Sequence, residues 1–375
     1  MKIVHAIMNE LEADPTQRRI GEGWVSGVVA LVLALLGLGT VLVLRYPQWL
    51  SVPEIRGAVD DTVVRLALQA GLLVSFIFAL VSLVLRQRRV LGLGAMVIIL
   101  MVIVLGGTHA HSQSSAFSHY YVGLDWFMLN LLLTGMLFLP LERLFARRAQ
   151  AVFRAEWRED LFYFFISSLM VQGLSYLAMA PSQVVVSYVQ EASFRDTVAA
   201  LPLWLQVIAI MFLTDLVQYW VHRAFHRVPW LWRFHAVHHS ARTMDWLAGS
   251  RMHLVEIVVL RGLTIIPMYA LGFAVEAIYS YLVIVYLYAT YIHANLKWDV
   301  EWLKPVLVTP RFHHWHHGIE KEAVDVNFAI HFPLFDRLFG TYYMPKGQWP
   351  AGYGVGGHPV PGGYLKQMLY PFGRK

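Results

Sequence analysis

The chain has no cysteine among its 375 residues, and only 14% of its residues are charged. Without cysteine there are no disulfides, thiolate zinc sites, iron–sulfur clusters or cysteine-ligated haem, so any metal must bind histidine, carboxylate or carbonyl groups. Soluble domains have about 25% charged residues. The low charge, together with 57% hydrophobic residues and a mean hydropathy of +0.52, therefore indicates a membrane protein. The net charge of +6 comes from Lys and Arg between apolar runs, where it reports membrane topology rather than nucleic-acid binding.

Apolar runs long enough to cross a bilayer recur along the chain. A hydrocarbon core of about 30 Å needs roughly 20 helical residues. Six runs approach or exceed this length, and a seventh is long enough for two spans around Gly272 or, because it contains Glu256 and Arg261, for a shallow buried hairpin. We therefore expect an all-α integral membrane protein with about eight transmembrane or membrane-embedded helices. The runs are Trp24–Leu44, Leu66–Leu85, Val90–Gly107, Leu124–Leu141, Leu161–Ala180, Leu201–Val221 and Leu254–Ile292.

Loop charge predicts the orientation, because short cytosolic loops are rich in Lys and Arg. The loops 86–89 and 143–158 are strongly basic, whereas 109–123 contains no Lys or Arg. This pattern places the N-terminus and all three histidine-rich segments on the cytosolic side. We expect the histidine-rich segments to form a helical cap there. Residues 1–150 contribute four spans without a dense polar cluster, so we expect a separate N-terminal membrane module of unknown role.

Histidine is concentrated in three segments after apolar runs. On a helix, residues i, i+3 and i+4 share a face, so each segment can direct its imidazoles to one place. Neutral ring nitrogens suit iron, zinc, copper or nickel, and this set exceeds what one ion binds, so two metals are implied. His314 is rotated off the shared face. Lone His293, at the end of the last apolar run, completes the set, and the predicted ligands are His222, His226, His235, His238, His239, His293, His313, His316 and His317.

Acidic residues near these segments are candidates for orienting the rings. Asp215 lies seven residues before His222, on nearly the same helix face. We expect it to accept a ring N–H and fix a ligand, although pairing with an Arg or with Gln218 explains it equally well. Glu256 and Asp325 are weaker candidates. His109, His111 and His119 lie on the opposite membrane side and are expected to be ordinary loop residues.

The three segments resemble the fatty acid hydroxylase and sterol desaturase superfamily of membrane di-iron enzymes. His222 to His226, His235 to His239 and His313 to His317 match its HxxxH, HxxHH and HxxHH boxes, and His293 matches an additional ligand position. The match extends over about residues 155–345, which makes 151–345 a hydroxylase-like catalytic domain and 346–375 a C-terminal tail. Leu254 replaces a common Pro and Phe328 a common Tyr, and neither is expected to touch the ligands. Flanking motifs that agree are Asp215–Arg223, Arg251–Glu256, Thr309–His313, Asp325–Asn327 and Phe335–Thr341.

The resemblance implies two iron ions, O₂ as co-substrate, and hydroxylation of an unactivated C–H bond of a fatty acyl, sterol or related lipid. Desaturation by the same ligands is the alternative. Electrons must come from an external reductase, ferredoxin or cytochrome, because the chain has no flavin motif or cysteine cluster. The absence of a C-terminal retention signal favours a bacterial inner membrane.

Two other classes remain open from the residues alone. A membrane electron carrier with bis-histidine haem would explain histidines at helix ends but not the adjacent pairs His238-His239 and His316-His317. A metal transporter would have its polar residues in mid-membrane rather than on one side.

Overall fold

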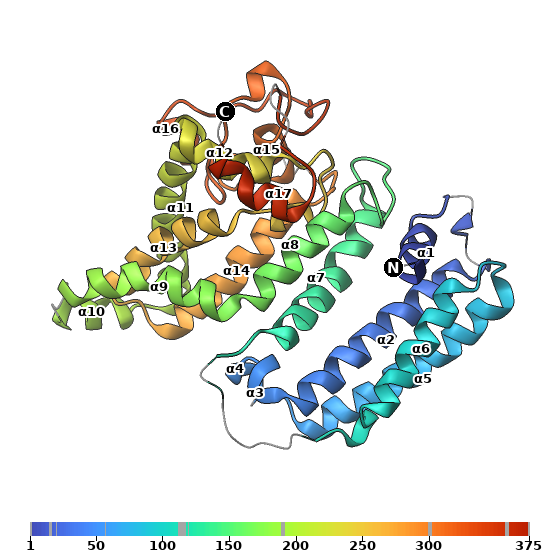
Figure 1. Cartoon of the computed structure of the whole chain (residues 1–375). Coiled ribbons are helices and arrows are strands. Elements are labelled where there is room, and N and C mark those ends of the chain that lie inside the picture. The colour runs from blue at the N-terminus through green and yellow to red at the C-terminus, as the bar shows by residue number, and fades with distance from the viewer. Residues whose placement is uncertain are drawn as a thin grey trace. The chain divides into compact units, whose positions relative to one another are not determined.

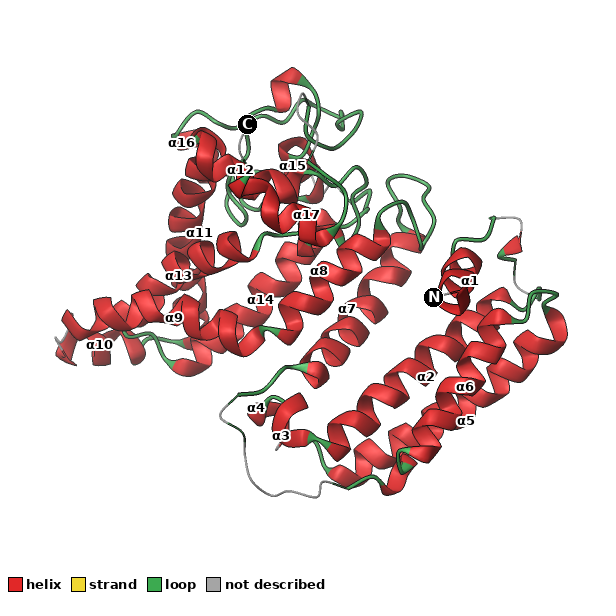
Figure 2. Ribbon diagram, in the orientation of Figure 1, coloured by secondary structure: helices red, strands yellow, loops and turns green. Residues whose placement is uncertain are grey.

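The computed structural model describes the whole chain except residues 1, 15–16, 20, 57, 112–117, 119, 189–191, 299–301, 357–359 and 374–375. The described residues form helices and loops, and none of them forms a strand (Figure 2). The all-α prediction is therefore confirmed. The chain divides into two compact units, which are described separately. Unit 1 comprises Met1–Leu132, Ala151–Arg154 and Ser168–Gln172, and unit 2 comprises Leu133–Gln150, Ala155–Ser167 and Gly173–Lys375. The division at residues 150 and 345 stays a prediction.

Unit 1 is a bundle in which three long helices pack through small residues. Buried Ala30, Ala34, Ala79 and Ala95 line the contact between them, and small side chains let helices approach closely in a membrane. At Gly27 a Cβ would lie 2.6 Å from Ser82 Oγ, so this approach requires glycine. The helices are α1 (Lys2–Leu11), α2 (Trp24–Arg45), α3 (Pro47–Leu50), α4 (Pro53–Arg56), α5 (Asp61–Leu85), α6 (Val90–Val104) and η2 (Gly107–His109).

Unit 2 is built around α11, which packs against α12, α13 and α14. Ile210, Met268, Ala277 and Tyr281 form a buried apolar cluster where α11, α13 and α14 meet. Figure 1 shows α12 and α15 at one end of this unit. Three helices are shared between the units: α7 (Leu124–Leu144) belongs to unit 2 from Leu133 onward, α8 (Trp157–Leu169) up to Ser167, and α9 (Val171–Tyr188) from Gly173. The other helices of unit 2 are α10 (Ala192–Ala199), α11 (Leu203–Arg227), α12 (Pro229–His239), η3 (Ala248–Ser250), α13 (Leu254–Ala270), α14 (Val275–His293), α15 (Pro310–His316), η4 (Lys321–Ala323), α16 (Leu334–Leu338), α17 (Tyr364–Leu369) and η5 (Tyr370–Phe372).

The apolar helices make the chain an integral membrane protein, with six described helices long and apolar enough to span a bilayer. These are α2, α5, the segment Val90–His109, α7, α11 and α14. The predicted span 161–180 is not one straight helix, because α8 and α9 meet at 67°; counted as one broken span, the pair is a seventh. α13 has 17 residues, about 26 Å of helix, which is shorter than the hydrocarbon core. The predicted count of eight is therefore not confirmed.

Candidate metal centre

Short connections bring the histidine segments together at one end of unit 2. His222 and His226 occupy the last turns of α11, and a single residue, Val228, separates α11 from α12. Proline stands at the first position of α12 and of α15, where its missing N–H is not needed and its fixed φ favours a helix start. His293 is the last residue of α14, and α14 packs against α15. Two helix ends and two short helices thus present all nine rings to one region.

The nine predicted ligands lie in two groups. Within each group, one ligand nitrogen from every ring lies within 4.8 Å of the others. Neighbours in sequence fall into different groups, as His238 and His239 do, because consecutive residues point in different directions around a helix. The first group contains His222, His226, His235, His239 and His316, and the second contains His238, His293, His313 and His317.

In two rings of the four-histidine group, a hydrogen bond to the outer ring nitrogen leaves the inner nitrogen without a proton. The Nδ1 atoms of His238 and His293 lie 3.1 Å from the Arg251 carbonyl and 2.6 Å from the Ala289 carbonyl. A carbonyl only accepts, so each Nδ1 carries the ring proton and each neutral ring presents a bare lone pair at Nε2. These two Nε2 atoms face each other at 3.2 Å, where they cannot bond to one another.

The spacing of the inner nitrogens fits cation binding. Nε2 of His222 lies 2.9 Å from Nε2 of His235, and Nε2 of His313 lies 3.0 Å from Nε2 of His293. A metal–imidazole bond of about 2.1 Å places two ligands at right angles about 3.0 Å apart. Both groups therefore have the donor type and the spacing of a transition-metal site.

Burial keeps the rings neutral. All six histidines of the second and third boxes are at most 5% exposed, and burial lowers the pKa of each well below its usual value near 6.5. A metal can therefore bind these rings near neutral pH without displacing protons. The six are His235, His238, His239, His313, His316 and His317.

Comparison with known proteins identifies this region. Residues 207–341 match the family model described as fatty acid hydroxylase, and the matched segment contains all nine histidines. The chain carries a fatty acid hydroxylase domain. The resemblance inferred from the three boxes is thereby confirmed.

Several curated proteins resemble the chain over the hydroxylase domain. An ornithine lipid hydroxylase from Rhizobium tropici is 29% identical over 46% of this chain and 52% of its own length. An alkylglycerol monooxygenase from Danio rerio is 31% identical over 37% of this chain and 30% of its own. A putative methylsterol monooxygenase from Dictyostelium discoideum is 28% identical over 41% and 58%. The chain thus spans about half of the first relative and less than a third of the second. No solved structure matches it.

Carboxylates contact two rings of the five-histidine group in the hydroxylase domain. Glu256 Oε1 lies 2.5 Å from Nδ1 of His235, and both side chains are buried. Asp325 Oδ1 lies 3.4 Å from Nδ1 of His226, and this contact lowers the pKa of Asp325. The two acids that we rank as weaker candidates from the sequence are therefore the ones that contact rings.

Asp215 contacts backbone instead of an imidazole. Its carboxylate oxygens accept hydrogen bonds from the backbone amides of Ile330 and Phe332, at 2.9 and 2.7 Å. These amides lie just beyond Phe328, whose carbonyl is 2.8 Å from Nδ1 of His222. Asp215 therefore acts on the ligands through the segment 328–332, and its position differs from the ring contact that we expect from the sequence.

Phe328 contacts the ligands, so the expectation that it does not was wrong. Its ring centroid lies 5.1 Å from that of His226 and 5.6 Å from that of His222. Val326, two residues earlier, offers its carbonyl 2.8 Å from Nδ1 of His316. The segment 325–328 therefore contacts three of the five rings in this group.

Asn327 fixes this segment. Its backbone φ is +58°, a left-handed conformation that a side chain disfavours. Its side-chain amide donates to the carbonyls of Phe312 and Tyr343, and its side-chain oxygen accepts from the Tyr343 amide. The side chain thus joins the segment 325–328 to Phe312 and Tyr343.

We expect Asn327→Ala to destabilise the domain by about 2–4 kcal/mol, because buried partners lose their hydrogen bonds and the strained backbone loses its support. Reversible unfolding in mixed micelles measures this change. Asn327→Gly relieves the backbone strain while losing the same hydrogen bonds, so it should fall between alanine and wild type. An alanine variant as stable as wild type would contradict this role.

Proposed function

We propose that the chain is a membrane oxidoreductase that uses O₂ to hydroxylate an unactivated C–H bond of a lipid, with two iron ions held by the nine histidines. The observation that carries the proposal is the pair of buried imidazole groups, with unprotonated nitrogens facing one another, inside a fatty acid hydroxylase domain. Five rings would hold one iron and four the other.

Bound iron would supply the O₂-dependent oxidation. In the overall reaction one oxygen atom of O₂ enters the C–H bond and the other leaves as water, which takes two electrons and two protons. The chain has no cysteine to hold an iron–sulfur cluster, and we propose an external reductase, ferredoxin or cytochrome as the source of these electrons. The protein's own residues contact six of the nine rings at Nδ1 and bury the rings away from water, which limits side reactions.

A lipid substrate agrees with the position of the rings on membrane helices. α11 and α14 are long and apolar enough to span a bilayer and carry three of the nine histidines. The relatives are named for ornithine lipid, alkylglycerol and methylsterol, which supports a lipid with a polar group. We place the protein in a bacterial inner membrane, with its N-terminus and its metal centre on the cytosolic side.

The alternatives receive less support. A desaturase would use the same ligands, but the relatives' names favour oxygen insertion.

A haem carrier needs room for a macrocycle around two axial histidines. His235 instead has Nε2 atoms of His222 and His239 at 2.9 and 3.1 Å, and further rings pack around them.

Lipid mass spectrometry tests the activity. Cells that express the wild-type chain should contain a lipid one oxygen atom heavier than its precursor, and cells that express His238→Ala/His239→Ala should not. A product lighter by two hydrogen atoms would instead establish desaturation. Identical lipid profiles under aerobic conditions with the electron donor present would contradict the proposal.

A further inference from the structure

The loop that follows the second histidine box contacts two ligands of the four-histidine group. At its end, the carbonyl of Arg251 lies 3.1 Å from Nδ1 of His238. Two residues earlier, Gly249 lies against the ring of His293, so close that a Cβ there would be 3.0 Å from Nδ1 and 3.2 Å from Cγ. The position of the loop 240–251 therefore determines where these two rings point.

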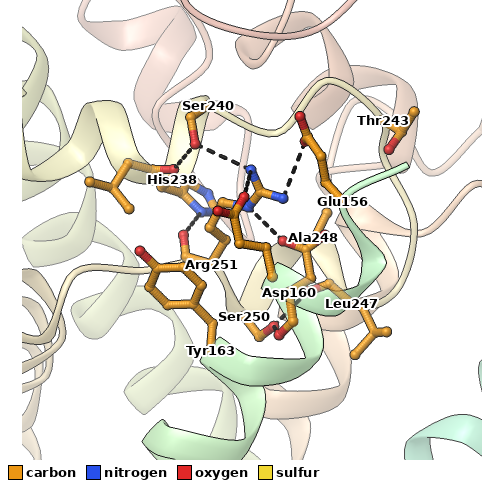
Figure 3. Close-up of polar contacts among 12 residues, drawn as sticks. Glu156, Asp160, Tyr163, His238, Ser240, Thr243, Leu247, Ala248, Ser250 and Arg251 are labelled. Atoms are coloured by element: carbon orange, nitrogen blue, oxygen red, sulfur yellow. Dashed lines mark hydrogen bonds and ion pairs between the residues drawn. The ribbon is translucent and has the colours of Figure 1, made fainter. Parts of the chain in front are cut away.

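The Arg251 side chain anchors this loop to the acidic start of α8. Its guanidinium is 1% exposed, and its Nε donates to Asp160 Oδ1 at 2.5 Å. Glu156 and Glu159 lie 3.2 and 3.6 Å from its other nitrogens. Figure 3 shows the guanidinium between Glu156 and Asp160, with the His238 ring beside the Arg251 backbone. Because a buried cation needs a partner, this ion pair holds Arg251 in one place.

Further hydrogen bonds join the loop to the same turn of α8. Ser250 Oγ donates to the Asp160 carbonyl at 3.1 Å, and Arg242 Nε donates to Glu156 Oε1 at 2.6 Å. Arg251 also reaches back to Ser240 Oγ, at 3.3 Å. Both ends of the loop are thus fixed to α8, whose acidic residues have no assigned role so far.

Different residues contact the ring nitrogens of the five-histidine group. Glu256 and the segment 325–328 contact its outer ring nitrogens. The loop 240–251 instead contacts His238 and His293, which both belong to the four-histidine group. The two groups are therefore held by separate parts of the domain.

We propose that Asp160 and Arg251 are positioning residues that fix His238 through the loop 240–251 and control metal binding by the four-histidine group alone. This inference rests on the proposed function, in which each group holds one metal. Loss of the ion pair should free the Arg251 carbonyl and let the His238 ring rotate, while the five rings of the other group keep their partners.

Metal titration of the full-length protein in detergent tests the inference, with Fe²⁺ added anaerobically and bound metal measured per chain. Asp160→Asn preserves the shape of the side chain and removes its charge. We expect it to weaken one of two binding steps by about 10–100-fold, the range for loss of a partner behind a ligand. Glu276→Gln, which removes an exposed carboxylate on α14, should bind like wild type.

Two combined variants show which group is affected. His235→Ala/Asp160→Asn should bind the metal that His235→Ala retains about 10–100-fold more weakly, whereas His238→Ala/Asp160→Asn should bind the same single metal as His238→Ala with unchanged affinity. That remaining metal also shows that the domain is folded. Unchanged titration of Asp160→Asn, or equal weakening of both steps, would overturn the inference and leave the proposed function intact. A wild-type chain that binds no metal would overturn both.

Discussion

His238→Ala/His239→Ala should abolish binding of both metals and lower lipid hydroxylation by more than about 100-fold, beyond the effect of losing a partner behind a ligand. The two residues are adjacent, but His238 belongs to the four-histidine group and His239 to the five-histidine group. Their Nε2 atoms lie 3.2 Å from His293 and 3.1 Å from His316, respectively. One local change therefore removes a ligand from each site.

Bound metal and hydroxylated lipid are measured on the same purified samples. The matched control is His5→Ala/His111→Ala, which removes two exposed histidines of unit 1 and should keep the metal content and the activity. Full metal content and activity in the His238/His239 variant would refute the ligand assignment. Loss of metal in the control would show that the measurement reports general damage.

Glu256→Leu should weaken metal binding by the five-histidine group by about 10–100-fold. Glu256 is buried and lies 2.5 Å from Nδ1 of His235. Its carboxyl group orients the ring, and its charged form, which a bound cation would favour, makes the opposite nitrogen a stronger donor. Leucine preserves much of the side-chain volume in this apolar setting while removing both effects.

Competition with a chelator measures this affinity. Glu256→Gln keeps an oxygen that can accept the ring N–H and loses only the charge, so its effect should be smaller than that of leucine. Equal losses in both variants would assign the whole effect to charge. Wild-type affinity in Glu256→Leu would show that Glu256 does not support the ligand.

The meeting of eight of the nine rings was predictable from helical spacing within three segments and from loop charge, and His293 was predictable from its place at the end of the last apolar run. Three segments with i, i+3 and i+4 spacing on one membrane side are expected to meet, and the structure brings them together. Their division into five and four was not predictable. It depends on how α14 and α15 pack beside α12, which places His293 with His238 and His316 with His239.

The residues that position the ligand rings were harder to predict. Asp215 lies on nearly the same helix face as His222, yet its carboxylate bonds to amides 115 and 117 residues later in the chain. The spacing of residues within one helix gives no information about contacts with a loop more than 100 residues later in the sequence. Phe328 was misjudged for the same reason. Arg251 was part of a recognised motif without a role, because its partner Asp160 lies 91 residues earlier.

The number of membrane spans was not predictable where a helix bends within an apolar run. Hydropathy predicts one span over 161–180, but the chain bends by 67° between α8 and α9 within that run. Apolar composition is the same on both sides of such a bend, so it cannot indicate where a helix breaks. The other five uninterrupted spans correspond to α2, α5, Val90–His109, α7 and α11.

Each of the two histidine groups should hold one metal. Iron content per chain, measured after anaerobic reconstitution of wild type, His235→Ala and His238→Ala, distinguishes this arrangement from a single shared site. We expect two irons in wild type and one in each variant, with no iron when both substitutions are combined. A wild-type chain with a single iron that either substitution removes, or variants that retain two, would contradict it.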